Sequence, residues 1–98
     1  MNDYILLMHS DHSRPMGDGA AWGHYIATLR ASGKFKGGSS IGGGLCVNQS
    51  GAVKPITAHL SGYMVIQAES LEDARTLLAG NPVLEAGGTV EIRELPRD

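Results

Sequence analysis

The sequence contains little cysteine, no basic run and no long apolar run, and each shortage excludes a class of protein. Cys46 is the single cysteine among 98 residues, so no disulfide can form within the chain, which favours a reducing compartment. The net charge is −2, so charge does not favour binding to nucleic acid or to an anionic membrane. The apolar run ILLM at residues 5–8 is too short for a signal peptide or a membrane span. We therefore expect a soluble, cytoplasmic protein.

The length fits a single domain that covers residues 1–98. A domain of this size hides only about 60–65 % of the surface that its unfolded chain exposes. A partner chain would therefore add useful burial.

The spacing of apolar residues predicts the secondary structure. A first helix, at about residues 18–32, carries an apolar stripe and is followed by Gly33, which suits a helix end. A second helix begins at Ser70, which with Asp73 forms a variant of the capping box, and it ends at Gly80, Asn81 and Pro82. Strands are expected at residues 4–9, 34–41, 61–68 and 89–95.

The order of these elements is β-α-β-β-α-β, which is typical of the ferredoxin-like fold. That α+β fold has one antiparallel sheet with two helices on one face. Residues 42–51 are expected to form a loop or a loose hairpin, in which residues 45–47 pair with residues 52–56.

The two central strands raise a problem of burial. Both alternating sets of side chains in residues 4–8 and 63–66 are largely apolar, whereas a strand with one wet face alternates between apolar and polar residues. Two helices cover one face only. We therefore expect a homodimer in which a second copy covers the other face of the sheet.

Two stretches resemble the YCII-related family, whose members are also called DGPF-domain proteins. They are WGHYIATLRASGKFKGG at residues 22–38 and GYMVIQAESLEDARTLLAGNPVLEAGGTVEIRELP at residues 62–96. The resemblance implies a ferredoxin-like subunit of a dimeric α/β barrel, in agreement with the burial argument. It implies little about the reaction, because a few members resemble lyases that act on chlorinated aromatic rings and most have no known activity.

The chain departs from the family at the positions that carry chemistry. The Asp-Gly-Pro-Phe signature falls on SGAV at residues 50–53, which keeps only the glycine. Some shorter members are thought to use a histidine and an aspartate, and those positions correspond to Trp22 and Asn81. A neutral indole and an amide do not exchange protons near pH 7. The proposed dyad is therefore absent here.

The segment MHSDHSRP at residues 8–15 contains the highest density of side chains that could act on a substrate. His9, Asp11 and His12 could bind a metal, but a zinc site needs three or four converging ligands and no other cluster supplies the rest. The favoured interpretation is a strand end with solvated side chains, and we expect no metal and no cofactor. His9 continues the Ile5–Leu7 side of its strand, however, and a histidine there suits acid–base chemistry.

Other residues could also contribute to a functional site. His59 precedes the strand that contains Tyr63 and could join His9 at one end of the sheet. Trp22 and Tyr63 are candidate walls of a ligand pocket, although Trp22 also suits the core. The run GGSSIGGG at residues 37–44 is not followed by a helix start, so it is interpreted as a flexible hairpin and not as a phosphate loop.

Two functions remain open at this point. The first is a non-catalytic or degenerate module that binds a small molecule as a homodimer. The second is a small cofactor-free lyase or isomerase that acts on an apolar or aromatic substrate, with His9 and His59 as its acid–base groups. The loss of the family's dyad and signature carboxylate slightly favours the first.

Overall fold

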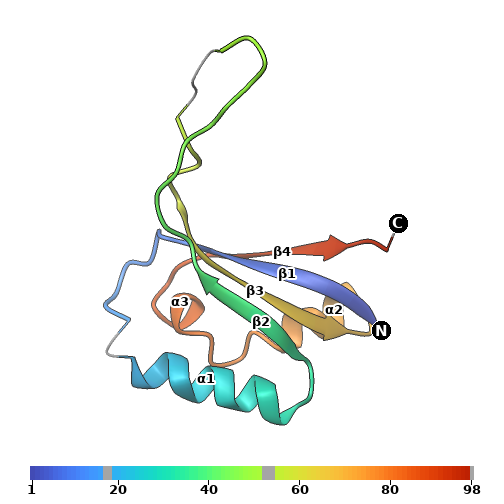
Figure 1. Cartoon of the computed structure of the whole chain (residues 1–98). Helices are drawn as coiled ribbons and strands as arrows, with labels where there is room; N and C mark the ends of the chain where they lie inside the picture. The colour runs from blue at the N-terminus through green and yellow to red at the C-terminus, as the bar shows by residue number, and fades with distance from the viewer. Residues whose placement is uncertain (17–18, 52–54, 98) are drawn as a thin grey trace.

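A computed structural model describes residues 1–16, 19–51 and 55–97 of the chain (Figure 1). It contains a four-stranded sheet and three helices. The strands are β1 (Asn2–His9), β2 (Phe35–Ser40), β3 (Leu60–Ala68) and β4 (Val90–Leu95). The helices are α1 (Ala20–Ala31), α2 (Leu71–Thr76) and α3 (Pro82–Glu85). The predicted strands and the first helix are confirmed to within a few residues, and Asp18, the expected start of that helix, lies outside the described residues.

The sheet has the strand order β2-β3-β1-β4, and every neighbouring pair is antiparallel. The register sets Leu6 opposite Met64 on one side and opposite Ile92 on the other, so these three side chains share a face. The helices lie on that face, as Figure 1 shows. This arrangement is the predicted ferredoxin-like α+β fold.

The second helical region is divided in two, which corrects the prediction that Gly80, Asn81 and Pro82 only end a helix. Ser70 caps α2 as expected, because its hydroxyl oxygen accepts a hydrogen bond from the Asp73 N–H. Gly80 then takes a φ of +85°, which suits glycine. Asn81 begins α3, since its side-chain oxygen accepts hydrogen bonds from Val83 N–H at 3.0 Å and Leu84 N–H at 3.2 Å. Pro82 occupies the first helical position. Proline suits this position because the backbone N–H that it lacks would have no partner within the helix.

The core fills the space between the sheet and the helices. Tyr4, Leu6 and Met8 of β1 are at most 4 % exposed, and they pack with buried residues of β3, α1, α2 and α3. The alternate residues of β1, including Ile5, Leu7 and His9, are only half-buried on the opposite face. We call that opposite face the open face, because no helix of the described chain covers it.

A long connection, residues 41–59, joins β2 to β3, and its described parts, residues 41–51 and 55–59, form an arm that stands away from the body of the protein (Figure 1). Its described residues form no strand, so the expected pairing of residues 45–47 with residues 52–56 is not seen, and residues 52–54 lie outside the described part. The two legs of the arm meet where the Cys46 thiol donates a hydrogen bond to the Pro55 carbonyl oxygen at 3.5 Å. The arm enlarges the molecule: the Cα radius of gyration is 14.9 Å, whereas a compact domain of this length has about 12.6 Å.

Candidate functional site

A cavity of about 470 Å³ lies between α1 and the strands β2 and β3. This volume falls within the range of about 300–1,000 Å³ that is typical of small-molecule sites. Most of its walls are apolar: Met8, Met16, Trp22, Ile26, Phe35, Met64 and Val83. Its polar lining consists of Arg30, Ser39, Ser40, Ser61 and Tyr63.

The cavity exists because its floor lacks side chains. Gly37, Gly38 and Gly62 line it on the two adjacent strands. A Cβ on Gly38 would lie 2.4 Å from the Tyr63 carbonyl oxygen, so only glycine fits there. Gly37 has a φ of +139° and marks an irregularity in the pairing of β2 with β3. The glycine run that the sequence analysis assigned to a flexible hairpin therefore also forms the floor of a pocket.

One stripe of α1 forms the roof of the cavity. Trp22, Ile26 and Arg30 recur every fourth residue and thus lie on one side of the helix, whereas Tyr25 and Leu29 belong to the buried core. The Arg30 guanidinium carbon lies 5.5 Å from the centre of the Phe35 ring, which stacks the cation on the aromatic face. Arg30 makes no ion pair with a carboxylate anywhere in the described chain. It is therefore a cation beside an apolar cavity, without a carboxylate partner among the described residues.

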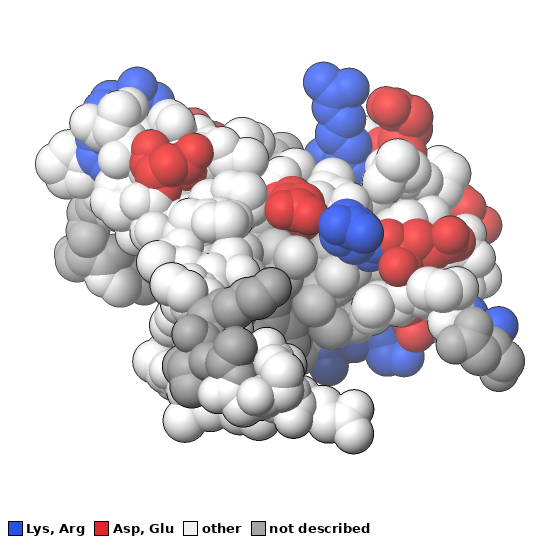
Figure 2. All heavy atoms as spheres, turned by 90° about the horizontal axis from the view of Figure 1, so that it is seen from above, with Lys and Arg blue, Asp and Glu red and all other residues white. Residues whose placement is uncertain are grey.

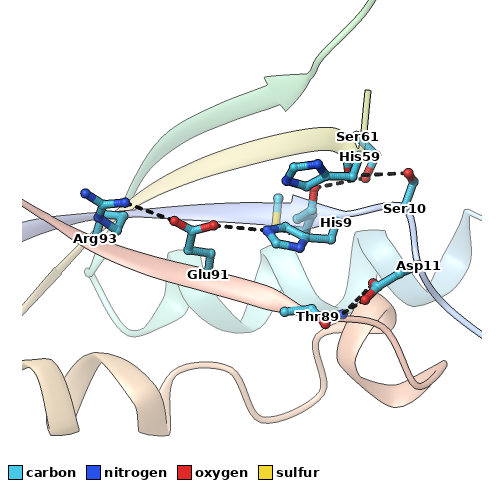
Figure 3. A network of polar contacts seen from close by, with 9 residues as sticks. His9, Ser10, Asp11, His59, Ser61, Thr89, Glu91 and Arg93 are labelled. Atoms are coloured by element: carbon cyan, nitrogen blue, oxygen red, sulfur yellow. Dashed lines mark hydrogen bonds and ion pairs between the residues drawn. The ribbon is translucent and has the colours of Figure 1, made fainter. Parts of the chain in front are cut away.

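A separate polar cluster lies on the open face, at the end of β1 (Figure 3). The His9 Nε2 atom lies 3.1 Å from a carboxylate oxygen of Glu91, and the other oxygen of Glu91 accepts a hydrogen bond of 3.1 Å from Arg93. The His59 ring stands edge-on to the His9 ring, with 4.7 Å between their centres. The base of the arm is tied to β1 here, because the Ser10 N–H donates to the His59 carbonyl oxygen at 2.7 Å.

The electrostatics of this cluster favour an ionised carboxylate. The hydrogen bond from Arg93, and next the contact with His9, lower the pKa of Glu91 below its usual value of 4.5. An ionised Glu91 can accept a hydrogen bond from Nε2–H of His9, and that contact leaves Nδ1 as the ring nitrogen without a contact to Glu91. The arrangement is a carboxylate–imidazole pair of the kind that supports general base chemistry.

The remaining polar residues of the opening window fasten the end of β1 to the start of β4. Asp11 accepts hydrogen bonds from the Thr89 hydroxyl at 2.7 Å and the Thr89 N–H at 2.8 Å, and these bonds, the hydroxyl first, lower the pKa of Asp11. His12 is exposed. The described chain contains no group of three or more side chains arranged to hold a metal ion.

The structure divides the candidate residues between two places. Trp22 and Tyr63 line the cavity, although the register of β3 puts the Tyr63 side chain on the open face opposite Leu7. His9 and His59 lie together on the open face and are not among the residues that line the cavity. The two histidines therefore lie outside the cavity that Trp22 and Tyr63 line.

Sequence reasoning missed two residues of these sites. Arg30 lies eight residues after Trp22, so the helical stripe that suggested Trp22 could have revealed it. The second residue is Glu91, which the sequence analysis does not name. Its pairing with His9 follows from the fold, because the ferredoxin-like strand order puts β4 beside β1.

The positions that correspond to the family's dyad have structural roles here. Trp22 packs edge-on to Tyr25, with 6.2 Å between the ring centres, and it lines the cavity. Asn81 is fully buried and caps α3. The Tyr25 hydroxyl donates a hydrogen bond to the Leu77 carbonyl oxygen just before that cap. Trp22 therefore contributes to packing and Asn81 to a helix cap, and neither side chain is suited to proton transfer.

Comparison with known proteins supports the fold. No protein-family profile matches the chain, and no curated protein matches it. A similar solved structure is 5-chloro-2-hydroxyhydroquinone dehydrochlorinase from Burkholderia phenoliruptrix AC1100, determined in complex with 2,5-dihydroxybenzoquinone. The match has a TM-score of 0.58 and 17 % identity, and it covers 97 % of this chain and 95 % of the other. The likeness confirms the predicted α+β fold class. No helix in the described part of the chain is long and apolar enough to cross a membrane.

Proposed function

We propose that this chain binds a small, planar, largely apolar molecule with one anionic group in the cavity beneath α1. The observation that carries the proposal is the position of Arg30 beside an apolar cavity, with no carboxylate partner in the described chain. The apolar walls would bury a ring, and the guanidinium would pair with a carboxylate or phenolate at its edge. This proposal agrees with a non-catalytic binding module.

The cavity also suggests how such a ligand would be oriented. Trp22 and Phe35 offer aromatic faces against which a flat ring can stack. Ser39, Ser40 and Ser61 add polar groups to the lining. The dehydrochlorinase of similar fold was solved with a planar dihydroxyquinone, which is a ligand of the same size class.

Isothermal titration with benzoate, 4-hydroxybenzoate and salicylate, each matched to its neutral amide, tests this proposal. We expect Arg30→Met to weaken binding of the acids by at least about tenfold, because a charge-assisted hydrogen bond is lost. Binding of the amides should change little. Arg75→Met is the matched control, because Arg75 is an exposed helical arginine far from the cavity lining. The proposal fails if no acid in this set binds, or if both variants bind the acids as the wild type does.

The working unit of this proposal is a homodimer joined through the open faces. Its support is the apolar character of Ile5, Leu7 and Val65, which are half-buried on a face without helices. Light scattering at micromolar concentration tests it. A monodisperse monomer of 10.3 kDa would exclude the dimer.

A second candidate function is general base catalysis by His9 in a lyase or isomerase without a cofactor. The observation that favours it is the 3.1 Å contact of His9 with Glu91, together with His59 at 4.7 Å. Glu91 would hold the ring in one tautomer, so that Nδ1 takes a proton from a carbon of the substrate.

Turnover of halogenated and hydroxylated aromatic compounds measures this second function. A general base contributes about 10²–10⁴-fold to a rate, so His9→Gln should lower turnover at least about a hundredfold. His24→Gln changes an exposed histidine of α1 and is the control. Asn81→Ala should mainly affect stability. A turnover unchanged by His9→Gln would exclude the mechanism.

A further inference from the structure

The arm between β2 and β3 exposes apolar side chains that no described residue of the chain covers. Leu45 is 73 % exposed and Val47 is 80 % exposed, whereas Cys46 between them turns toward the other leg. Residues 45 and 47 therefore share one side of an extended leg. Ile41 and Ile56, at 36 % and 38 % exposed, add apolar surface nearer the base of the arm.

The arm also lacks the charge that a solvated loop usually carries. Lys54 is the single charged residue between Lys36 and Glu69, and no carboxylate occurs in the whole interval. Figure 2, which looks down from the side of the arm, shows red and blue side chains on the rest of the molecule, while the described part of the arm is white. A surface that is apolar and uncharged is typical of the centre of an interface.

The open face is a small platform for an interface between two copies. Its strands are 8, 6, 9 and 6 residues long. Four strands of about seven residues, about 4.8 Å apart and rising about 3.4 Å per residue, have a flat footprint of roughly 450 Å². A stable interface buries about 800 Å² of accessible surface on each partner. A second surface beside the sheet would therefore strengthen a dimer that forms through the open face.

We propose that the arm packs against a second copy of this chain, with Leu45 and Val47 as its anchoring side chains. This inference rests on the homodimer proposed above. A second copy is the fitting occupant because a twofold interface brings identical surfaces together, and an arm with a single charged residue in its sequence meets its own copy with little repulsion. The arm also leaves the sheet at the end that holds Ser40 and Ser61, both in the cavity lining. The arm thus extends the interface beyond the sheet from a point next to the proposed ligand site.

Sedimentation equilibrium of the full chain tests the inference with three proteins. They are the wild type, the double variant Leu45→Asp/Val47→Asp, and the control Leu71→Asp/Leu84→Asp, which changes two exposed leucines on the helices. We expect the arm variant to raise the dimer dissociation constant by at least about tenfold, because two side chains that the second copy would bury become charged. The control should keep the wild-type value, and circular dichroism should show that all three are folded.

The outcomes separate this inference from the proposed dimer. A wild type that stays monomeric at every attainable concentration overturns both. A dimeric wild type whose dissociation constant is unchanged in the arm variant, or changed equally in the control, overturns the role of the arm alone. A photo-crosslinking residue at position 45 gives an independent readout. Crosslinks between two chains support the inference, and crosslinks confined to one chain contradict it.

Discussion

The two faces of the sheet have nearly the same apolar spacing, yet they differ in how the chain uses them. On the helix-facing side of β1, Leu6 is fully buried by the protein's own helices. On the open side, Leu7 is half-buried and lies near an ion-pair chain that runs from His9 through Glu91 to Arg93. The comparison teaches that apolar spacing alone marks a face for burial but does not say which molecule buries it.

The sharpest test of this comparison is a pair of neighbouring leucines. We expect Leu6→Ala to lower the free energy of unfolding by about 2–5 kcal/mol, since it leaves a cavity in the core. Leu7→Ala should cost at most about 1 kcal/mol in dilute protein, and its cost should grow with protein concentration, because it acts on the dimer. Urea unfolding at several concentrations measures both. If the stability cost of Leu7→Ala does not change with protein concentration, the open face takes no part in a dimer.

A second test uses the two helix caps on the covered side. Asn81 is fully buried and satisfies two N–H groups of α3, so Asn81→Ala should cost about 1–3 kcal/mol. Ser70→Ala removes an exposed cap of α2 and should cost about 1 kcal/mol. Thermal unfolding of the two variants ranks them. The reverse order would contradict the structural role assigned to Asn81.

The smallest expected effect is the pH dependence of the ion-pair chain on the open face. Arg93 and His9 lower the pKa of Glu91 below 4.5, so the folded protein favours the ionised carboxylate. The stability that this provides is present above the unfolded pKa, and it is lost as the pH falls through the lower, folded pKa. We expect wild type to lose more stability than Glu91→Gln on acidification below about pH 4.5. Salt should weaken the difference, because exposed charges are screened.

Urea unfolding between acidic and neutral pH gives this comparison directly. Glu94→Gln is the control, because Glu94 is exposed on the same strand and makes no ion pair within the described residues. Glu94→Gln should lose as much unfolding free energy as the wild type when the pH falls. If Glu91→Gln also loses as much as the wild type, the ionised Glu91 does not contribute to stability.

Most of the fold could be predicted from the sequence because its signals are local. The stripe on α1, the cap at Ser70 and the alternating runs of β1 and β3 each lie within one element, and their boundaries differ from the structure by a few residues. The split of the second helical region was missed because Asn81 and Pro82 serve both as a helix end and as a helix start. Their second role depends on burial against α1, which is not visible in a short window.

The candidate sites were only partly predictable, because they arise from contacts between distant elements. Trp22 was named from its helical stripe, but the cavity itself depends on Gly38 and Gly62, whose effect is the absence of side chains on two paired strands. The pairing of His9 with Glu91 joins the first strand to the last. A sequence pattern can suggest each residue, and only the strand order puts them within reach of each other.

The strand order also governs how the chain is assembled during synthesis. Of the four strands, β1 is synthesised before the others and occupies the interior of the sheet, while its neighbours β3 and β4 begin at residues 60 and 90. A nascent chain that stops before β4 therefore presents one edge of its most apolar strand with unpaired N–H and C=O groups. Such an edge is a template for pairing with other chains. Termination before residue 90 is thus expected to produce an aggregating fragment, and synthesis of β4 completes the sheet.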